Sequence, residues 1–223
     1  MSAPQQLLAG MSGKIKYTFE ENFDGVMAGG HGQTNFDNAG WTTSGSNVVT
    51  NYTTSPAPLQ GNYSLVINGT SYCRTGLGGN CTNLYFQLAR IGTIHSQFQS
   101  VLYNYVGGWH QFGLVAGATA NTVRIQHASA TVSAYSADTT ALTLNQKYHV
   151  WLEYVASGVG ASNGIGRLWM STDGTKPGSP TVEMTNGTCE YAAGLGAITL
   201  NAFNGACITD RYLAANFLIG DNP

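Results

Sequence analysis

The stretch KYHVWLEYVASGVGASNGIGRLWMSTDGTKP, residues 147–177, decides the fold. Apolar and more polar positions alternate along its first half, which is the period of a β-strand with one buried face. One predicted face carries Tyr148, Val150, Leu152 and Tyr154, and the other carries His149, Trp151, Glu153 and Val155. Asn163-Gly164 and Asp173-Gly174 flank the next apolar run, as turn residues flank the strands of hairpins. The stretch therefore predicts two strands, Tyr148–Val155 and Gly166–Ser171.

The same alternation of apolar and polar residues continues in both directions along the chain. Short alternating runs separated by Gly, Asn, Asp and Ser predict further strands. They are Ile15–Phe19, Ser64–Ile67, Leu84–Leu88, Gln99–Val106, Trp109–Ala116, Thr122–His127, Thr131–Tyr135, Ala197–Ala202 and Leu213–Ile219. No stretch combines a helical period with helix start and stop signals. Many short strands at even spacing predict an all-β sandwich or barrel.

Composition agrees with one β domain and excludes some partners. The 223 residues suit a single sandwich, and 43% of them are hydrophobic, which is enough for a sizeable core. Only 9% are charged, against about 25% in an ordinary soluble domain. The net charge of −2 offers no basic surface for nucleic acid. No apolar run reaches the length of a membrane span, so we expect no membrane insertion.

The first sixteen residues differ from the rest and predict an N-terminal arm, residues 1–16, ahead of a domain at residues 17–223. The arm holds Pro4, Gly10 and Gly13 around a short apolar patch, Leu7 and Leu8. Such a segment becomes ordered when a partner holds it. The opening residues do not resemble a secretory signal, so we expect export by another route, such as lysis or assembly into a particle.

The four cysteines form two close pairs in the sequence, Cys73 with Cys81 and Cys189 with Cys207. Sequence allows three connectivities and does not choose among them, and no spacing fits a zinc site. We expect at least one disulfide, in oxidising surroundings. The alternative is four buried free thiols.

Several segments resemble concanavalin-like and laminin-G-like jelly-roll domains. The resemblance covers residues 17–220 and is carried by residues 147–177 and by ENFDG (21–25), GWTTSG (40–45), YTTSPAPLQGNYSLVINGTS (52–71) and AANFLIG (214–220). It implies a two-sheet antiparallel jelly-roll sandwich whose opening strand pairs near the last strand. The resemblance says little about function, because this superfamily holds lectins, laminin modules, glycosidases, lyases and phage virion proteins. PQQLLAG (residues 4–10) also looks like openings of bacteriophage structural proteins.

The resemblance also implies a possible calcium site. Laminin-G-like domains hold Ca²⁺ with Asp and Asn side chains and backbone carbonyls, because a hard cation prefers several oxygens. The candidate ligands are Asp24, Asp37, Asn38 and Asp210. Asp24 and Asp210 become neighbours if the two ends of the domain pair. The alternative is that each is a turn residue that caps its own backbone.

No catalytic set is visible in the sequence, and we expect a protein that is not an enzyme. Glycoside hydrolysis needs two carboxylates on either side of one bond, and no strand carries alternating carboxylates. His149 and Glu153 share one strand face. We interpret them as residues that line a sheet rather than as an acid–base pair.

A sugar platform is a second binding hypothesis. Saccharides stack on aromatic rings and accept hydrogen bonds around their rim. Tyr103, Tyr105, Trp109 and His110 lie in or near one predicted strand and its turn. The alternative is that these rings pack in the core.

The sequence thus supports three functional hypotheses. The first is a structural protein on the exterior of a phage virion, as a capsid decoration or tail-associated jelly roll. It would assemble with other virion proteins and with copies of itself through Leu7 and Leu8, and bind host-surface glycans. The second is a stand-alone extracellular lectin-like module, and the third and weakest is a polysaccharide-degrading enzyme.

Overall fold

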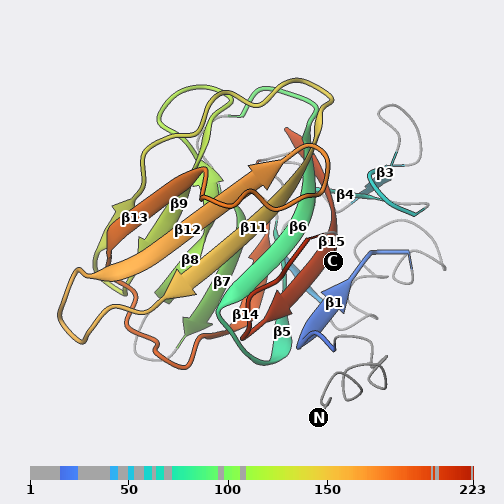
Figure 1. Ribbon diagram of the computed structural model, residues 1–223. Coiled ribbons are helices and arrows are strands. Elements are labelled where there is room, and N and C mark those ends of the chain that lie inside the picture. Colours follow the sequence, from blue (N-terminus) through green and yellow to red (C-terminus); the bar gives the residue numbers. More distant parts are fainter. Residues whose placement is uncertain are drawn as a thin grey trace, which may run out of the picture.

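The protein is an all-β sandwich of two antiparallel sheets (Figure 1). The computed structural model describes residues 16–24, 41–44, 50–52, 58–61, 64–67, 72–94, 98–105, 109–201, 203, 206–221 and 223. Within them, no helix is long and apolar enough to cross a membrane. The expected two-sheet jelly-roll architecture is confirmed.

The eight-stranded sheet lies in front in Figure 1 and has the order β13-β12-β11-β6-β15-β4-β3. β1 also belongs to it and pairs with β15. The strands are β1 (Phe19–Glu21), β3 (Thr50–Tyr52), β4 (Ser64–Val66), β6 (Asn83–Arg90), β11 (Lys147–Val155), β12 (Gly164–Ser171), β13 (Val182–Gly187) and β15 (Cys207–Ala215).

The seven-stranded sheet lies behind it and has the order β10-β9-β8-β7-β14-β5-β2. Its strands are β2 (Thr42–Ser44), β5 (Tyr72–Cys81), β7 (Phe98–Tyr105), β8 (Trp109–Ala116), β9 (Val123–Ala128), β10 (Ser133–Tyr135) and β14 (Leu195–Leu200). Most of the predicted strands are therefore present.

The first strand pairs with the last, as the resemblance implied. Phe19 is opposite Ala214 and Glu21 is opposite Tyr212, whereas the other half of β15 pairs with β4 through Thr209 and Leu65. The change of partner coincides with a bulge between Asp210 and Leu213, where Arg211 has a φ of 51°. A bulge bends a strand and changes the direction of its side chains. This bend lets β15 pair with both β1 and β4 along the same edge.

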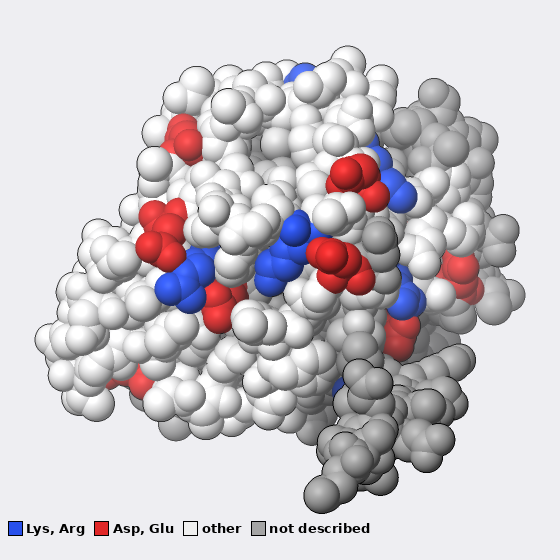
Figure 2. Space-filling view, viewed as in Figure 1, with Lys and Arg blue, Asp and Glu red and all other residues white. Residues whose placement is uncertain are grey.

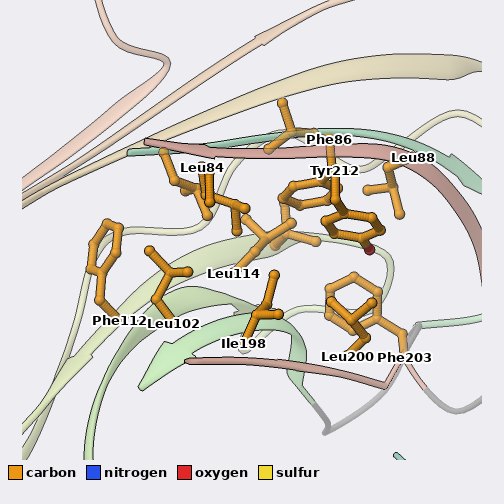
Figure 3. Close-up of a cluster of buried hydrophobic side chains, with 14 of the residues drawn as sticks. Leu84, Phe86, Leu88, Leu102, Phe112, Leu114, Ile198, Leu200, Phe203 and Tyr212 are labelled. Carbon is orange, nitrogen blue, oxygen red and sulfur yellow. The ribbon is translucent and has the colours of Figure 1, made fainter. Parts of the chain in front are cut away.

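An apolar layer fills the space between the sheets (Figure 3). Leu84, Phe86, Leu88 and Tyr212 of the eight-stranded sheet face Leu102, Phe112, Leu114, Ile198 and Leu200 of the other, with Phe203 beside them. The rings of Phe86 and Tyr212 stack with centroids 5.2 Å apart, a contact worth about 1 kcal/mol beyond the area it buries. Each strand therefore has one side fixed to the core.

A buried histidine joins the two sheets at one end of this layer. His127 of β9 is fully buried, and its Nδ1 accepts a 2.9 Å hydrogen bond from the Cys189 amide. Its Nε2 lies 3.2 Å from the Val155 carbonyl, at the end of β11. Burial lowers the pKa of His127, so the ring is neutral, with the proton on Nε2. A Cβ on Gly187 would lie 2.5 Å from this ring, so the ring requires glycine there.

The outer side of the eight-stranded sheet is partly covered by both ends of the domain. Tyr85, Trp151, Trp169 and Leu213 form a second apolar cluster with Ile219, and Tyr17 packs against it. The indole of Trp151 donates a 3.0 Å hydrogen bond to the Gly220 carbonyl, and Tyr17 stacks on Phe217. The aromatic residues of this side are thus packing residues.

The predicted disulfide is not formed, because all four cysteines are buried free thiols. Cys73 and Cys81 lie on the same strand, β5, opposite Leu200 and Leu195 of β14, and five residues of strand span about 17 Å. Cys189 lies beside the Val155 end of β11 through the bond from Ser157. Cys207 is opposite Arg90, at the Lys147 end. The two pairs that are close in sequence are therefore too far apart in space for a bond that needs Cα atoms about 6 Å apart.

The thiols provide a direct test of this arrangement. Burial raises the pKa of Cys73 and of Cys207, so both stay protonated and shielded from reagents. We expect a chromogenic disulfide reagent at pH 8 to label none of the four thiols in the native protein. It should label all four in urea without reductant. A count in urea that rises when reductant is added would show a disulfide instead.

Candidate functional site

The residues on the outer side of the seven-stranded sheet are determined by the residues that its other side buries in the core. In β9, Val123 and Ile125 lie in the core, so Arg124 and Gln126 point away from it. The same alternation around buried Leu102 and Phe112 sets Tyr103 and Gln111 on the outer side. We call this surface the Tyr103 face; it comprises Arg74, Tyr103, Gln111, Gly113, Val115, Arg124, Gln126, Tyr135 and Thr199.

Strand register arranges these positions in rows across the sheet. Gln126 is opposite Tyr135 on one side and Gly113 on the other. The row continues through Val101, Thr199, Arg74 and Thr42. The adjacent row brings Tyr103 between Gln111 and Ala197. Tyrosine, glutamine and arginine from strands far apart in sequence therefore share one surface.

The middle of the Tyr103 face is a floor of small residues with polar atoms left over. Gly113 is buried, and Val115 and Thr199 are only 7% and 8% exposed. The Thr199 hydroxyl and the Arg124 Nε are both buried and have no hydrogen-bond partner among the described residues. Buried polar atoms in native proteins are nearly always satisfied. Gln87 Oε1, His110 Nδ1, Thr209 Oγ1 and Arg211 Nε are in the same state elsewhere in the described part of the protein, so these two atoms alone do not mark a binding site.

The sugar platform predicted from the sequence is only partly assembled here. Tyr103 lies on the face and is partly buried. Tyr105 and Trp109 are directly paired across β7 and β8, but their side chains lie outside the described part. His110 is on the opposite side, where its ring lies 4.8 Å from that of Tyr191. Including His110 was wrong, because neighbours in a strand point to opposite faces.

Gln111, Arg124, Gln126 and Thr199 were missed as candidates from the sequence. The signal was present in part, because Arg124 and Thr199 each sit between two apolar residues, and Gln111 and Gln126 each sit between an apolar residue and a histidine. Alternation alone does not say which strands are neighbours, so it did not bring these residues together.

His149 and Glu153 do not form an acid–base pair. Glu153 accepts a 2.9 Å hydrogen bond from Arg167, which also binds Glu183. His149 lies 2.8 Å from the Tyr85 hydroxyl through its Nδ1, and burial lowers the pKa of its ring. Both residues line the outer side of the eight-stranded sheet, as interpreted from the sequence.

The predicted neighbours Asp24 and Asp210 do lie close together. The charge of Asp24 contributes to the high pKa of Asp210, and Asp24 packs against Gly61, where a Cβ would collide with its carboxylate. Among the described residues, however, no group of three or more His, Cys, Asp or Glu side chains could hold a metal. Asp37 and Asn38 lie outside the described residues, so the calcium site stays a prediction.

Asp210 itself is held as an acceptor inside the protein. Its Oδ2 accepts bonds from the Ser64 hydroxyl at 2.9 Å and from the Gln60 amide at 3.2 Å. Its Oδ1 accepts a 2.7 Å bond from the Arg211 amide. Burial nevertheless raises its pKa to about 7, because three donors do not replace full hydration of the charge. The residue joins the loop at residues 59–61 to β15.

The chain was compared with known proteins. No protein-family model and no curated protein sequence matches it. The solved alginate lyase Aly36B aligns with a TM-score of 0.50 and 8% identity, over 90% of this chain and 97% of the lyase chain. Domain 4 of AbnA, an extracellular GH43 arabinanase from Geobacillus stearothermophilus, aligns with a TM-score of 0.44 and 13% identity, over 91% and 94% of the two chains.

The carbohydrate-binding module CBM66 from Bacillus subtilis aligns with a TM-score of 0.42 and 12% identity, over 79% of this chain and 94% of the module. At these identities the likenesses bear on the fold alone. The match to Aly36B agrees with a two-sheet jelly-roll sandwich.

The pKa of Asp210 predicts how stability depends on pH. Because this pKa is about 7 in the folded protein and about 4 when unfolded, the folded state binds more protons between these values. Asp210 therefore stabilises the fold most below about pH 4, and that stability is lost as the pH rises through 7. This shift in the pKa of Asp210 changes the free energy of unfolding by at most about 4 kcal/mol.

Asp210→Asn should remove this loss, because an amide does not titrate. We expect the free energy of unfolding in urea to fall more steeply between pH 5 and pH 8 for the natural protein than for the variant. Glu190→Gln, on an exposed hydrogen bond to the Gly160 amide, is the control that should follow the natural protein. Parallel curves for all three proteins would contradict the pKa assignment.

Proposed function

We propose that this protein binds carbohydrate on the Tyr103 face of its seven-stranded sheet. The observation that carries the proposal is the direct pairing of Tyr103 with Gln111 on one sheet face, next to the row of residues that holds Thr199 and Arg74. A sugar ring has an apolar face that stacks on an aromatic ring and hydroxyl groups that bond to amides and hydroxyls. The face offers both kinds of group.

The fold is suited to such a role. The alginate lyase Aly36B, which has the same kind of sandwich, has been solved as a variant in complex with an alginate trisaccharide. That complex supports the proposal only as an example of the fold, because 10% identity transfers no residue roles.

We propose binding without turnover. The side chains described on the Tyr103 face are Tyr, Gln, Thr, Val and Arg, which supply stacking, hydrogen bonds and positive charge. Turnover on a polysaccharide panel, seen as reducing ends or unsaturated products, would replace this proposal with an enzymatic one.

Tyr103→Ala tests the site. Loss of one stacking ring is worth about 1 kcal/mol, or roughly a fivefold weaker affinity for any polysaccharide that binds. Tyr103→Phe is the matched control, because it keeps the ring and should keep most of the affinity. Calorimetric titration with a panel of neutral and acidic polysaccharides measures both, and melting temperatures check the fold. Equal affinity of the natural protein and Tyr103→Ala would contradict the site.

We also propose, from the sequence, that the N-terminal arm docks the protein on a virion or on copies of itself. Leu7 and Leu8 lie outside the described residues, so the proposal rests on composition. The first backbone bond of the domain to β15 runs from Thr18 to Ala214, so an arm that ends at Lys16 can be removed without breaking the sheet.

Deleting residues 1–16 should leave a folded monomer with an unchanged melting temperature. The full chain should form larger species in light scattering and should be incorporated into particles, whereas the shortened chain should do neither. If both chains are monomers and both are incorporated equally, the arm has no assembly role.

A further inference from the structure

The basic side chains on the two sheets have different contact partners. Figure 2 shows basic and acidic side chains mixed on the face of the eight-stranded sheet. There Arg167 binds Glu153 and Glu183, and Arg211 binds Glu20 at 2.6 Å. Lys147 and Lys176 donate to the carbonyls of Leu59 and Ile219. These cations therefore already have oxygen acceptors within the protein.

The two arginines of the Tyr103 face contact tyrosine rings instead. The Arg124 guanidinium carbon lies 4.2 Å from the centre of the Tyr135 ring, and that of Arg74 lies 5.9 Å from the centre of Tyr72. Neither arginine makes a salt bridge with a described carboxylate. A guanidinium stacked on a ring keeps its planar edge of N–H donors free, and that edge matches a carboxylate or sulfate.

Asp138 is the described acid whose titration feels the charge of Arg124. Its two oxygens accept bonds from the Ala118 and Thr119 amides and from the Thr122 hydroxyl. It is therefore held by the turn between β8 and β9, and it leaves Arg124 without an ion pair among the described residues.

The spacing of the two arginines suits a chain that crosses the strands. Arg124 is on β9 and Arg74 on β5, with β8, β7 and β14 between them. Four strand spacings amount to about 19 Å, and the floor at Gly113 and Thr199 lies between the two ends. A single small anion cannot reach both arginines, whereas an extended oligomer with repeated acidic groups can.

We propose that the ligand of the Tyr103 face is an acidic polysaccharide, whose carboxylate or sulfate groups bind Arg124 and Arg74 and one of whose sugar rings stacks on Tyr103, in the row of residues next to that of Arg74. This inference rests on the proposed carbohydrate-binding function and names its ligand class. Arg124 is partly buried and makes no salt bridge with a described carboxylate, so an acidic group supplies the anionic partner that its guanidinium lacks.

The test compares matched ligands that differ only in charge. Polygalacturonate is compared with its methyl ester, and dextran sulfate with dextran, by calorimetric titration at low and at physiological salt. We expect the acidic member of at least one pair to bind more than tenfold more tightly, with the difference shrinking in salt. The pair that shows the preference tells whether carboxylate or sulfate is recognised.

Arg124→Gln and Arg74→Gln should each weaken binding of the acidic ligand about tenfold or more, with little effect on the neutral one. Arg167→Gln makes the same change in net charge on the other sheet and should not weaken binding. Arg124→Lys keeps the positive charge but not the planar guanidinium, so we expect an intermediate loss of affinity for the acidic ligand. This variant still tests the site if Arg124→Gln folds poorly.

Two results would overturn the inference in distinguishable ways. If neutral and acidic ligands bind equally and both depend on Tyr103, the carbohydrate site stands and the acidic class is wrong. If Arg167→Gln weakens binding as much as the two face variants, the preference comes from net charge and not from this face. No binding to any polysaccharide would remove the proposed function together with this inference.

Discussion

The packing of the apolar layer between the sheets determines which side chains the protein presents on its surface. Phe112 and Ile125 are fully buried in that layer, and a strand that buries one residue must turn the next one outward. A shift of one residue in β8 or β9 would exchange the core with the Tyr103 face. The core therefore fixes the position of Gln111 and Arg124 as firmly as that of its own residues.

The two outer surfaces of the sandwich have different physical roles. On the eight-stranded sheet, Trp151 and Trp169 are buried beneath the chain's own end segment, and Arg167 is held between two carboxylates. The cations of that surface, Arg167 and Arg211, are paired with carboxylates, although Gln87 Oε1 and Arg211 Nε are also buried without a hydrogen-bond partner among the described residues. On the Tyr103 face, Arg124 and Arg74 lie against tyrosine rings and make no salt bridge with a described carboxylate. A binding surface needs such unused donors, because a ligand gains only from groups that the protein has not already paired.

The sequence predicted the parts whose pattern is local. Trp109–Ala116 was predicted with the observed bounds, and β11 to within one residue, because their alternation is unbroken. β5 was missed because Gly76, Gly78 and Gly79 interrupt its pattern. The last strand was placed too late because the bulge at Arg211 resets the alternation. Tyr103 was found as a local aromatic, whereas Arg74 joins Gln126 only through the register of five strands.

The same topology separates the proposed functions in space. Both described ends of the domain lie on the eight-stranded sheet, since β1 pairs with β15 and Trp151 binds Gly220. The proposed arm would therefore join the domain at that sheet, whereas the Tyr103 face belongs to the other. Attachment through the arm and sugar binding through the Tyr103 face then use different surfaces, so one does not require the loss of the other. A protein attached to a particle through the proposed arm would still expose its proposed carbohydrate-binding face.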